Sequence, residues 1–278
     1  MSKINSFLYK NKVTNIEFVV FFRISIGLLF LIHFISYWGD FELLFSNKAI
    51  IKKDIQNLNN IMLNFENIII YFFKKLGFEL RESILFFKLI IVFLTLSIVL
   101  GFYSRINSLI LLLLHASFIK THSFLIYGVD YFTSMSLFYI MIFPSDINYS
   151  LRNLFKNYSK KNIFHITISK KFFQIHLCII YFFSGLDKAL GFNWWNGEAI
   201  WKAINLPNFY NDFNINLATL ANYPLIFILI GILTIIIEIL YPIFINLKIT
   251  KNIWLLLTIL MHFGILFILN LYFFSIIM

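Results

Sequence analysis

The stretch FFQIHLCIIYFFSGLDKAL, residues 172–190, is apolar enough to cross a bilayer, yet it carries a lysine, Lys188, close to one end. A lysine at the centre of a spanning helix costs roughly 2.5–3.5 kcal/mol. It therefore requires a counter-charge, a water-filled cavity or a chemical role. Lys188 is for this reason the first candidate functional residue of the chain.

Apolar residues make up 60% of the 278 positions, and they are gathered into blocks rather than spread as in a soluble core. Each block approaches the ~20 residues that a spanning helix needs. We predict an all-α, polytopic transmembrane bundle of a single domain over residues 1–278, with no separate soluble domain. Seven spans are expected, within a range of six to eight, at residues 17–37, 84–103, 106–122, 129–145, 172–190, 224–246 and 252–277.

Two segments between the blocks are typical of helices that lie on a membrane surface. Residues 60–76 combine an apolar face with Glu66, Lys74 and Lys75, as in an amphipathic interfacial helix. Residues 194–206 contain three tryptophans, which suit the aromatic belt of a bilayer. For the second segment, simple anchoring explains the pattern equally well.

Charge and cysteine content narrow the functional classes. The net charge is +10, but the basic residues lie in the loops between apolar blocks, which indicates membrane topology and lipid headgroups rather than nucleic acid. Cys178 is the only cysteine, so the chain has no internal disulfide and no CxxC pair. The histidines show neither HxxxH nor HExxH spacing, and no metal site is expected. Because no cleavage site follows it, the first block is expected to remain as a span.

Several polar residues fall inside apolar blocks, where each demands a partner. Glu238 is the only acidic residue well inside a span, so it is the natural partner of Arg23, Lys88 or Lys188. Structural ion pairing is the simpler explanation for Arg23, Lys88 and Glu238. For Lys88, extension of the ammonium group to the membrane interface explains the position equally well. The residues concerned are Arg23, Lys88, His115, His176, Lys188, Glu238 and His262.

In residues 172–190 the polar and small side chains recur at steps of four and three, which places them on one helical face. This stripe is expected to line a cavity or a helix interface rather than lipid. His176 lies off the stripe and is expected to be packed or interfacial. The stripe consists of Gln174, Cys178, Tyr181, Gly185 and Lys188.

Four motifs follow one another along the chain: FRISIG at 22–27, HSFLIYGVD at 122–130, YFFSGLDK at 181–188 with Trp194 or Trp195 and NGE at 196–198, and His262 with SIIM at 275–278. In this order they resemble the vitamin K-dependent gamma-carboxylase superfamily, the horizontally transferred transmembrane domain. The resemblance is distributed over nearly the whole chain.

The resemblance implies a mechanism. In the family's carboxylase, the motif lysine deprotonates a quinol so that oxygen converts it to an epoxide, and the base so generated removes a proton from a glutamate side chain. Lys188 occupies the lysine position, and an amine in an apolar cavity loses its proton more readily. The resemblance thus implies a reduced quinone as cofactor, with catalytic Lys188, His122 and His262 and cavity residues Tyr181, Trp194 and Asp130.

Two departures from the family pattern matter. Asp187 stands where the carboxylase has a second basic residue, and its carboxylate opposes deprotonation of Lys188. The carboxylase also carries a large soluble region after its spans, whereas this sequence is expected to be a short, stand-alone member. Similar short members occur in bacteria, and one group belongs to the export or maturation machinery of a sporulation-delaying peptide toxin.

Two hypotheses of function remain open. The first is a quinol-dependent carboxylase-like or epoxidase-like lyase or oxidoreductase, with Lys188 as the base on a lipid quinol or another apolar substrate. The second is a non-catalytic membrane component of peptide-toxin maturation, export or immunity, with a small secreted peptide or a membrane protein as its partner. A transporter is disfavoured, because the sequence shows no inverted repeat and no matching Gly or Pro interruptions.

The expected location is the cell membrane, with the N-terminus in the cytoplasm. Residues 146–171 carry six basic residues, and such density beside spans favours the cytoplasmic side. In a Cys178→Ser background, a cysteine introduced by Asn157→Cys should resist a membrane-impermeant thiol reagent in intact cells and react after permeabilisation. Efficient labelling of intact cells would reverse the predicted orientation.

Overall fold

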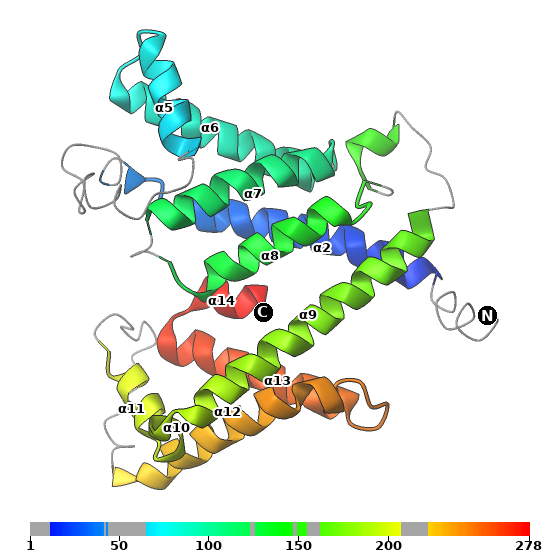
Figure 1. The fold of residues 1–278 in the computed structure, drawn as a ribbon, viewed down its shortest axis with the longest axis vertical. Coiled ribbons are helices and arrows are strands. Elements are labelled where there is room, and N and C mark those ends of the chain that lie inside the picture. Colours follow the sequence, from blue (N-terminus) through cyan, green and yellow to red (C-terminus); the bar gives the residue numbers. More distant parts are fainter. Residues whose placement is uncertain are drawn as a thin grey trace. The chain divides into compact units, whose positions relative to one another are not determined.

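The computed structural model describes residues 12–41, 43, 65–122, 126–146, 149–154, 162–206 and 222–278. The regular elements in these ranges are all helices (Figure 1), which confirms the all-α class. Within the same ranges, five helical segments are long and apolar enough to cross a membrane: Ile16–Ser36, Leu80–Val99, Ile166–Leu190, Pro224–Phe244 and Lys251–Leu269. The chain is therefore an integral membrane protein, and the bilayer is its solvent.

Two further predicted spans form helices that fall short of this standard. They are α7, Ser104–Thr121, and α8, Gly128–Ile142, of 18 and 15 residues. At 1.5 Å per residue, α8 is about 22 Å long, less than the ~30 Å of a hydrocarbon core. The total of seven spans stays a prediction.

The last predicted span, 252–277, is not one helix. Its first part is α13, Lys251–Leu269, and its last part is α14, Tyr272–Ile277. Asn270 separates them with a φ of 52°, in the left-handed region that ends a helix and that asparagine tolerates better than most residues. The apolar block was predicted as continuous because its composition does not change at this point.

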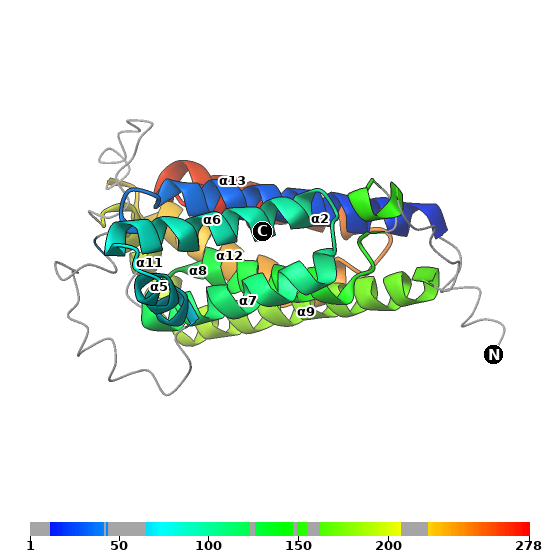
Figure 2. The same ribbon diagram turned by 90° about the horizontal axis from the view of Figure 1, so that it is seen from above.

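The chain divides into two compact units, one up to Lys170 and the other from Lys171. In the first unit α2 (Lys12–Ser36) and α6 (Leu80–Val99) lie beside α7 and α8 (Figures 1 and 2). A short link at 100–103 makes α6 and α7 antiparallel neighbours. The 3₁₀ turn η2, Leu151–Leu154, follows α8, and α9, Asn162–Leu190, begins in this unit and continues into the second.

The predicted amphipathic helix is present as α5, Phe65–Lys75, and the residues 60–64 of that prediction lie outside the described ranges. The ring of Phe73 stacks on Phe86 of α6, with 4.6 Å between centroids. Ile68, Tyr71 and Phe72 are exposed on the other face. Such an unburied apolar face suits a helix at a membrane surface, and this placement stays a prediction.

Arg23 of α2 is fully buried, and its charge is met by the segment that follows α8. Its Nη1 donates to the carbonyl oxygen of Ser145 at 2.7 Å, and its Nη2 donates to that of Tyr149 at 2.6 Å. The carboxylate of Asp146 lies 4.0 Å from Nη1. Arg23 is thus held by Asp146 and two carbonyl groups. None of these is Glu238, the partner that the sequence suggested.

Asp146, which follows α8, also contacts the start of α7 and the turn η2. Its carboxylate accepts from the backbone N–H of Ser104 at 3.2 and 3.3 Å, at the start of α7, and from Arg152 at 3.3 Å. Gly101, with a φ of +72°, lies against this cluster, and a Cβ there would collide with the Arg23 guanidinium. A glycine is therefore required at this turn both for its backbone conformation and for space.

Lys88 of α6 contacts a carbonyl group and two aromatic rings. Its Nζ donates to the carbonyl oxygen of Trp38 at 2.6 Å and lies 4.8 and 5.1 Å from the ring centroids of Trp38 and Phe41. These ring faces attract the ammonium group electrostatically.

The second unit consists of the later part of α9, the short helices α10 (Phe192–Trp195) and α11 (Glu198–Ile204), then α12 (Pro224–Phe244), α13 and α14. Residues 194–206, predicted as an interfacial piece, thus form the end of α10 and the whole of α11. Both pack on α12, where Gly231 leaves room for the carbonyl group of Trp194. Their position relative to a bilayer stays a prediction.

Asp146→Asn should destabilise the first unit strongly, because Arg23 would keep a buried charge without its counter-ion. Breaking a buried pair in this way costs about 3–5 kcal/mol, and a lower melting temperature in detergent measures it. Glu198→Gln, in an exposed pair with Lys202, is the control and should melt like the unmodified protein. Equal melting of Asp146→Asn and the control would show that the carbonyls alone neutralise Arg23.

Candidate functional site

Lys188 of α9 and Glu238 of α12 form an ion pair, with 2.7 Å between Nζ and Oε2. The exposed fractions of the two side chains are 20% and 8%. The same Nζ donates to the Oγ of Ser184 at 2.6 Å and lies 5.3 Å from the ring centroid of Trp194. Of the three cations that the sequence left open for Glu238, the structure places Lys188 against it.

A glycine one turn before Lys188 allows this pair to form. Gly185 lies where α9 and α12 approach, and a Cβ there would come within 2.7 Å of the backbone nitrogen of Ile239 and 2.8 Å of the Cβ of Glu238. Tyr181 and Gly185 are buried, as the stripe predicts, whereas Gln174 at its other end is exposed. The stripe is therefore a helix interface between Tyr181 and Lys188.

Tyr181 and His262 meet on the same side of α9. The Tyr181 hydroxyl lies 2.8 Å from Nε2 of His262, and both side chains are buried. The Tyr181 ring stacks on Tyr241, one turn after Glu238 on α12, at 4.2 Å between centroids. Two residues that the family resemblance assigned to one site, Tyr181 and His262, are thus in direct contact.

A cavity of about 230 Å³ opens beside this contact. Lys188 and Glu238 are absent from its described lining, and Lys188 follows Tyr181 by seven residues, about 10 Å along the helix axis. The second unit therefore holds two polar centres, the ion pair and the tyrosine–histidine pair. The cavity is lined by Leu177, Tyr181, Tyr241, Leu255, Thr258, Ile259, His262, Phe263, Leu266, Ser275, Ile276 and Met278.

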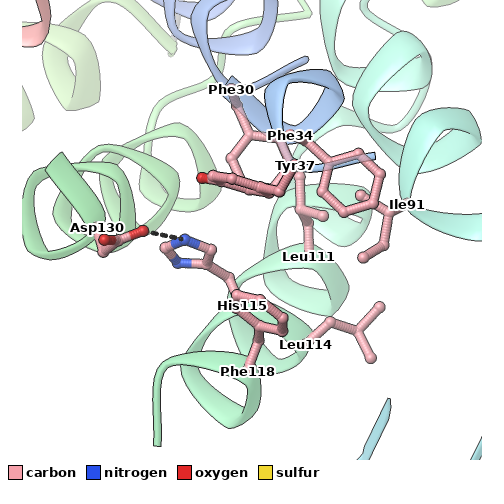
Figure 3. Close-up of a pocket in the computed structure, with 9 residues that line it drawn as sticks. All are labelled: Phe30, Phe34, Tyr37, Ile91, Leu111, Leu114, His115, Phe118 and Asp130. Carbon is pink, nitrogen blue, oxygen red and sulfur yellow. Dashed lines mark ion pairs between the residues drawn. The ribbon is translucent and has the colours of Figure 1, made fainter. Parts of the chain in front are cut away.

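His122 and Asp130 belong to the first unit, and Lys188 and His262 belong to the second. His122 is buried at the end of α7, with its ring stacked on Phe118 and its Nδ1 3.2 Å from the Phe118 carbonyl oxygen. Asp130 forms an ion pair with His115, at 3.6 Å between Oδ1 and Nε2 (Figure 3). The partner of Asp130, a residue of the HSFLIYGVD motif, is therefore His115, to which the sequence assigned no role.

Asp130 and His115 are part of a buried polar cluster that the sequence analysis missed. Figure 3 shows them beside Tyr37, around a cavity of about 20 Å³, which is room for one water molecule. The Tyr37 hydroxyl lies 2.6 Å from a ring nitrogen of His33. The four-residue step from His33 to Tyr37 at the end of the first span was the signal that could have revealed this face.

Electrostatic effects outside the spans are modest. Burial and, to a smaller extent, the charge of Asp130 raise the pKa of Tyr127 from its ordinary value near 10 to about 12. The hydrogen bond and charge of Lys202 lower the pKa of the exposed Glu198. Across the described ranges, no three His, Cys, Asp or Glu side chains gather into a metal site.

Comparison with protein-family models, with curated proteins and with solved structures finds no match for the chain. The resemblance to the carboxylase superfamily rests on the motifs alone.

Glu238→Gln should lower the stability and yield of the protein, because Lys188 would be left as a buried cation without a counter-ion. The expected cost is about 3–5 kcal/mol. Thermal unfolding of the purified variant measures it, with Glu198→Gln again as the exposed control. A melting temperature equal to that of the unmodified protein would mean that Ser184 and Trp194 suffice to stabilise Lys188.

Proposed function

We propose that the chain is a membrane enzyme of the carboxylase-like transmembrane family, in which Lys188 takes a proton from a lipid-soluble substrate. A reduced lipid quinone is the first candidate. The observation that carries the proposal is the pairing of Lys188 with Glu238 at 2.7 Å inside a unit of apolar helices. The motif around Lys188 supports the family, and the partial exposure of its side chain leaves a route for a substrate.

The ion pair bears directly on this chemistry. A protonated Lys188 cannot accept a second proton, but transfer of one proton from Nζ to Oε2 gives a neutral amine and a neutral acid. A base at Lys188 requires this neutral form, which the ion pair reaches through that transfer. The amine can then accept the proton of a substrate hydroxyl, while Ser184, at 2.6 Å, holds Nζ in place.

A second candidate function is a non-catalytic membrane component of peptide-toxin maturation, export or immunity. The same pair favours it, because Glu238 and Ser184 satisfy Lys188 within the chain itself. In that case the polar groups only hold the helices together. A small secreted peptide encoded in the neighbouring reading frame would favour this function, and a redox partner would favour the enzyme.

Replacement of Lys188 separates the two functions. Arginine keeps the charge and the pairing with Glu238 but does not deprotonate in proteins. If Lys188 is a base, Lys188→Arg and Lys188→Ala should both lower turnover by roughly 10²-fold or more. Turnover is followed in lipid nanodiscs supplied with oxygen and reduced lipid quinones, by mass spectrometry of quinol and product. The Arg variant should remain folded in a thermal-shift assay.

Lys202→Ala is the matched control, because it removes an exposed lysine that is also paired at 2.7 Å, with Glu198. It should turn over substrate like the unmodified protein. A folded Lys188→Arg variant with full turnover would exclude the base. An unmodified protein that consumes no quinol but copurifies with a secreted peptide would establish the non-catalytic function instead.

A further inference from the structure

Two buried polar groups beside the 230 Å³ cavity have no hydrogen-bond partner among the residues that the structure describes. They are Nδ1 of His262, on α13, and Oγ of Ser275, on α14. Both residues line the cavity, and the His262 side chain is more than nine-tenths buried. In a bilayer no water compensates for such groups, so a ligand that satisfies them gains both hydrogen bonds.

The contact with Tyr181 decides what His262 can offer a ligand. The single hydrogen-bond partner of the Tyr181 hydroxyl within the described ranges is Nε2 of His262, at 2.8 Å. We assign the hydroxyl proton to this contact, with Nε2 as the acceptor, because the hydroxyl has no other acceptor in the described ranges. A neutral imidazole that accepts at Nε2 carries its proton on Nδ1. His262 thus presents a donor, and the ligand must supply an acceptor oxygen.

The remaining lining selects a neutral, apolar ligand. Among the described residues no Asp, Glu, Lys or Arg borders the cavity, and apolar side chains such as Leu266 and Phe263 form most of its described wall. An apolar cavity of about 150 Å³ holds benzene, so one of 230 Å³ holds a larger ring system. An apolar wall with a few convergent polar groups is the usual composition of a small-molecule site.

We propose that this cavity binds a compact, neutral, lipid-soluble molecule that carries a carbonyl-type oxygen. The oxygen accepts hydrogen bonds from Nδ1–H of His262 and from the Ser275 hydroxyl. The site goes beyond the proposed function, because Lys188 does not border it and binding there requires no base. A hydrocarbon chain of an ordinary lipid is the competing occupant, and it would leave both polar groups unsatisfied.

The test uses benzophenone as a photoreactive probe on the purified full chain in nanodiscs. After irradiation, mass spectrometry should locate the adducts on residues of the cavity wall, such as Leu266 and Met278. The competitors 2-adamantanone and adamantane have nearly the same shape, and only the first has a carbonyl oxygen. The ketone should compete at roughly tenfold lower concentration, as expected for one or two net hydrogen bonds.

Variants assign this preference to the two groups. Ser275→Ala and His262→Phe should reduce the advantage of the ketone towards one. Thr258→Val is the matched control: it removes another hydroxyl of the same wall, but that hydroxyl already donates to the Trp254 carbonyl oxygen at 2.8 Å. It should leave the advantage intact. Ser275→Ala keeps the test decisive if His262→Phe fails to fold.

Adducts spread outside the cavity wall would overturn the proposed site. Equal competition by adamantane and 2-adamantanone, with Ser275→Ala unchanged, would show that the cavity holds only hydrocarbon chains and would overturn the proposed ligand class. The assay requires no turnover, so its failure is distinct from failure of Lys188 as a base.

Discussion

The absence of water in the hydrocarbon core is the constraint on which the rest of this structure depends. A charged or polar side chain inside a spanning helix must find its partner in the chain itself. Arg23 is paired with a carboxylate and two carbonyl groups. Lys88 contacts one carbonyl group and two aromatic rings. Lys188 is paired with a carboxylate and a hydroxyl group. These contacts determine which helices must lie together.

A glycine lies beside each of two buried ion pairs, Arg23–Asp146 and Lys188–Glu238. In both cases it leaves space that a side chain would fill. Gly101 lies against the Arg23 guanidinium, and Gly185 lies against the Cβ of Glu238. In both places a methyl group would occupy the space of the pair or of the backbone beside it. Because packing rather than water exclusion holds helices together in lipid, small residues are the means by which two backbones come close enough for short charged contacts.

The length of the apolar blocks predicted the long helices, and periodicity predicted the face of α9 on which Tyr181 and Gly185 are buried. A spanning helix must show its polar residues on the side that faces protein. The position of Lys188 in an apolar block was enough to predict that its charge has a partner. The sequence could not identify that partner as Glu238, because it offered three cations for a single carboxylate; the structure does so. Asp146, the partner of Arg23, lay just beyond an apolar block, where a charged residue calls for no explanation. The break at Asn270 was missed because a single residue in the left-handed conformation leaves no trace in hydropathy.

The geometry of α9 connects the two polar centres of the second unit. Tyr181 and Lys188 are separated by seven residues on one face, which fixes about 10 Å between them along the axis. A compact ligand beside His262 therefore cannot serve as the substrate of Lys188 unless it moves. A molecule that combines an oxygen-bearing ring with a chain of about this length along α9 could contact both centres at once. Binding at the cavity and proton transfer at the ion pair are thus separable events. The length of the ligand decides whether one molecule takes part in both.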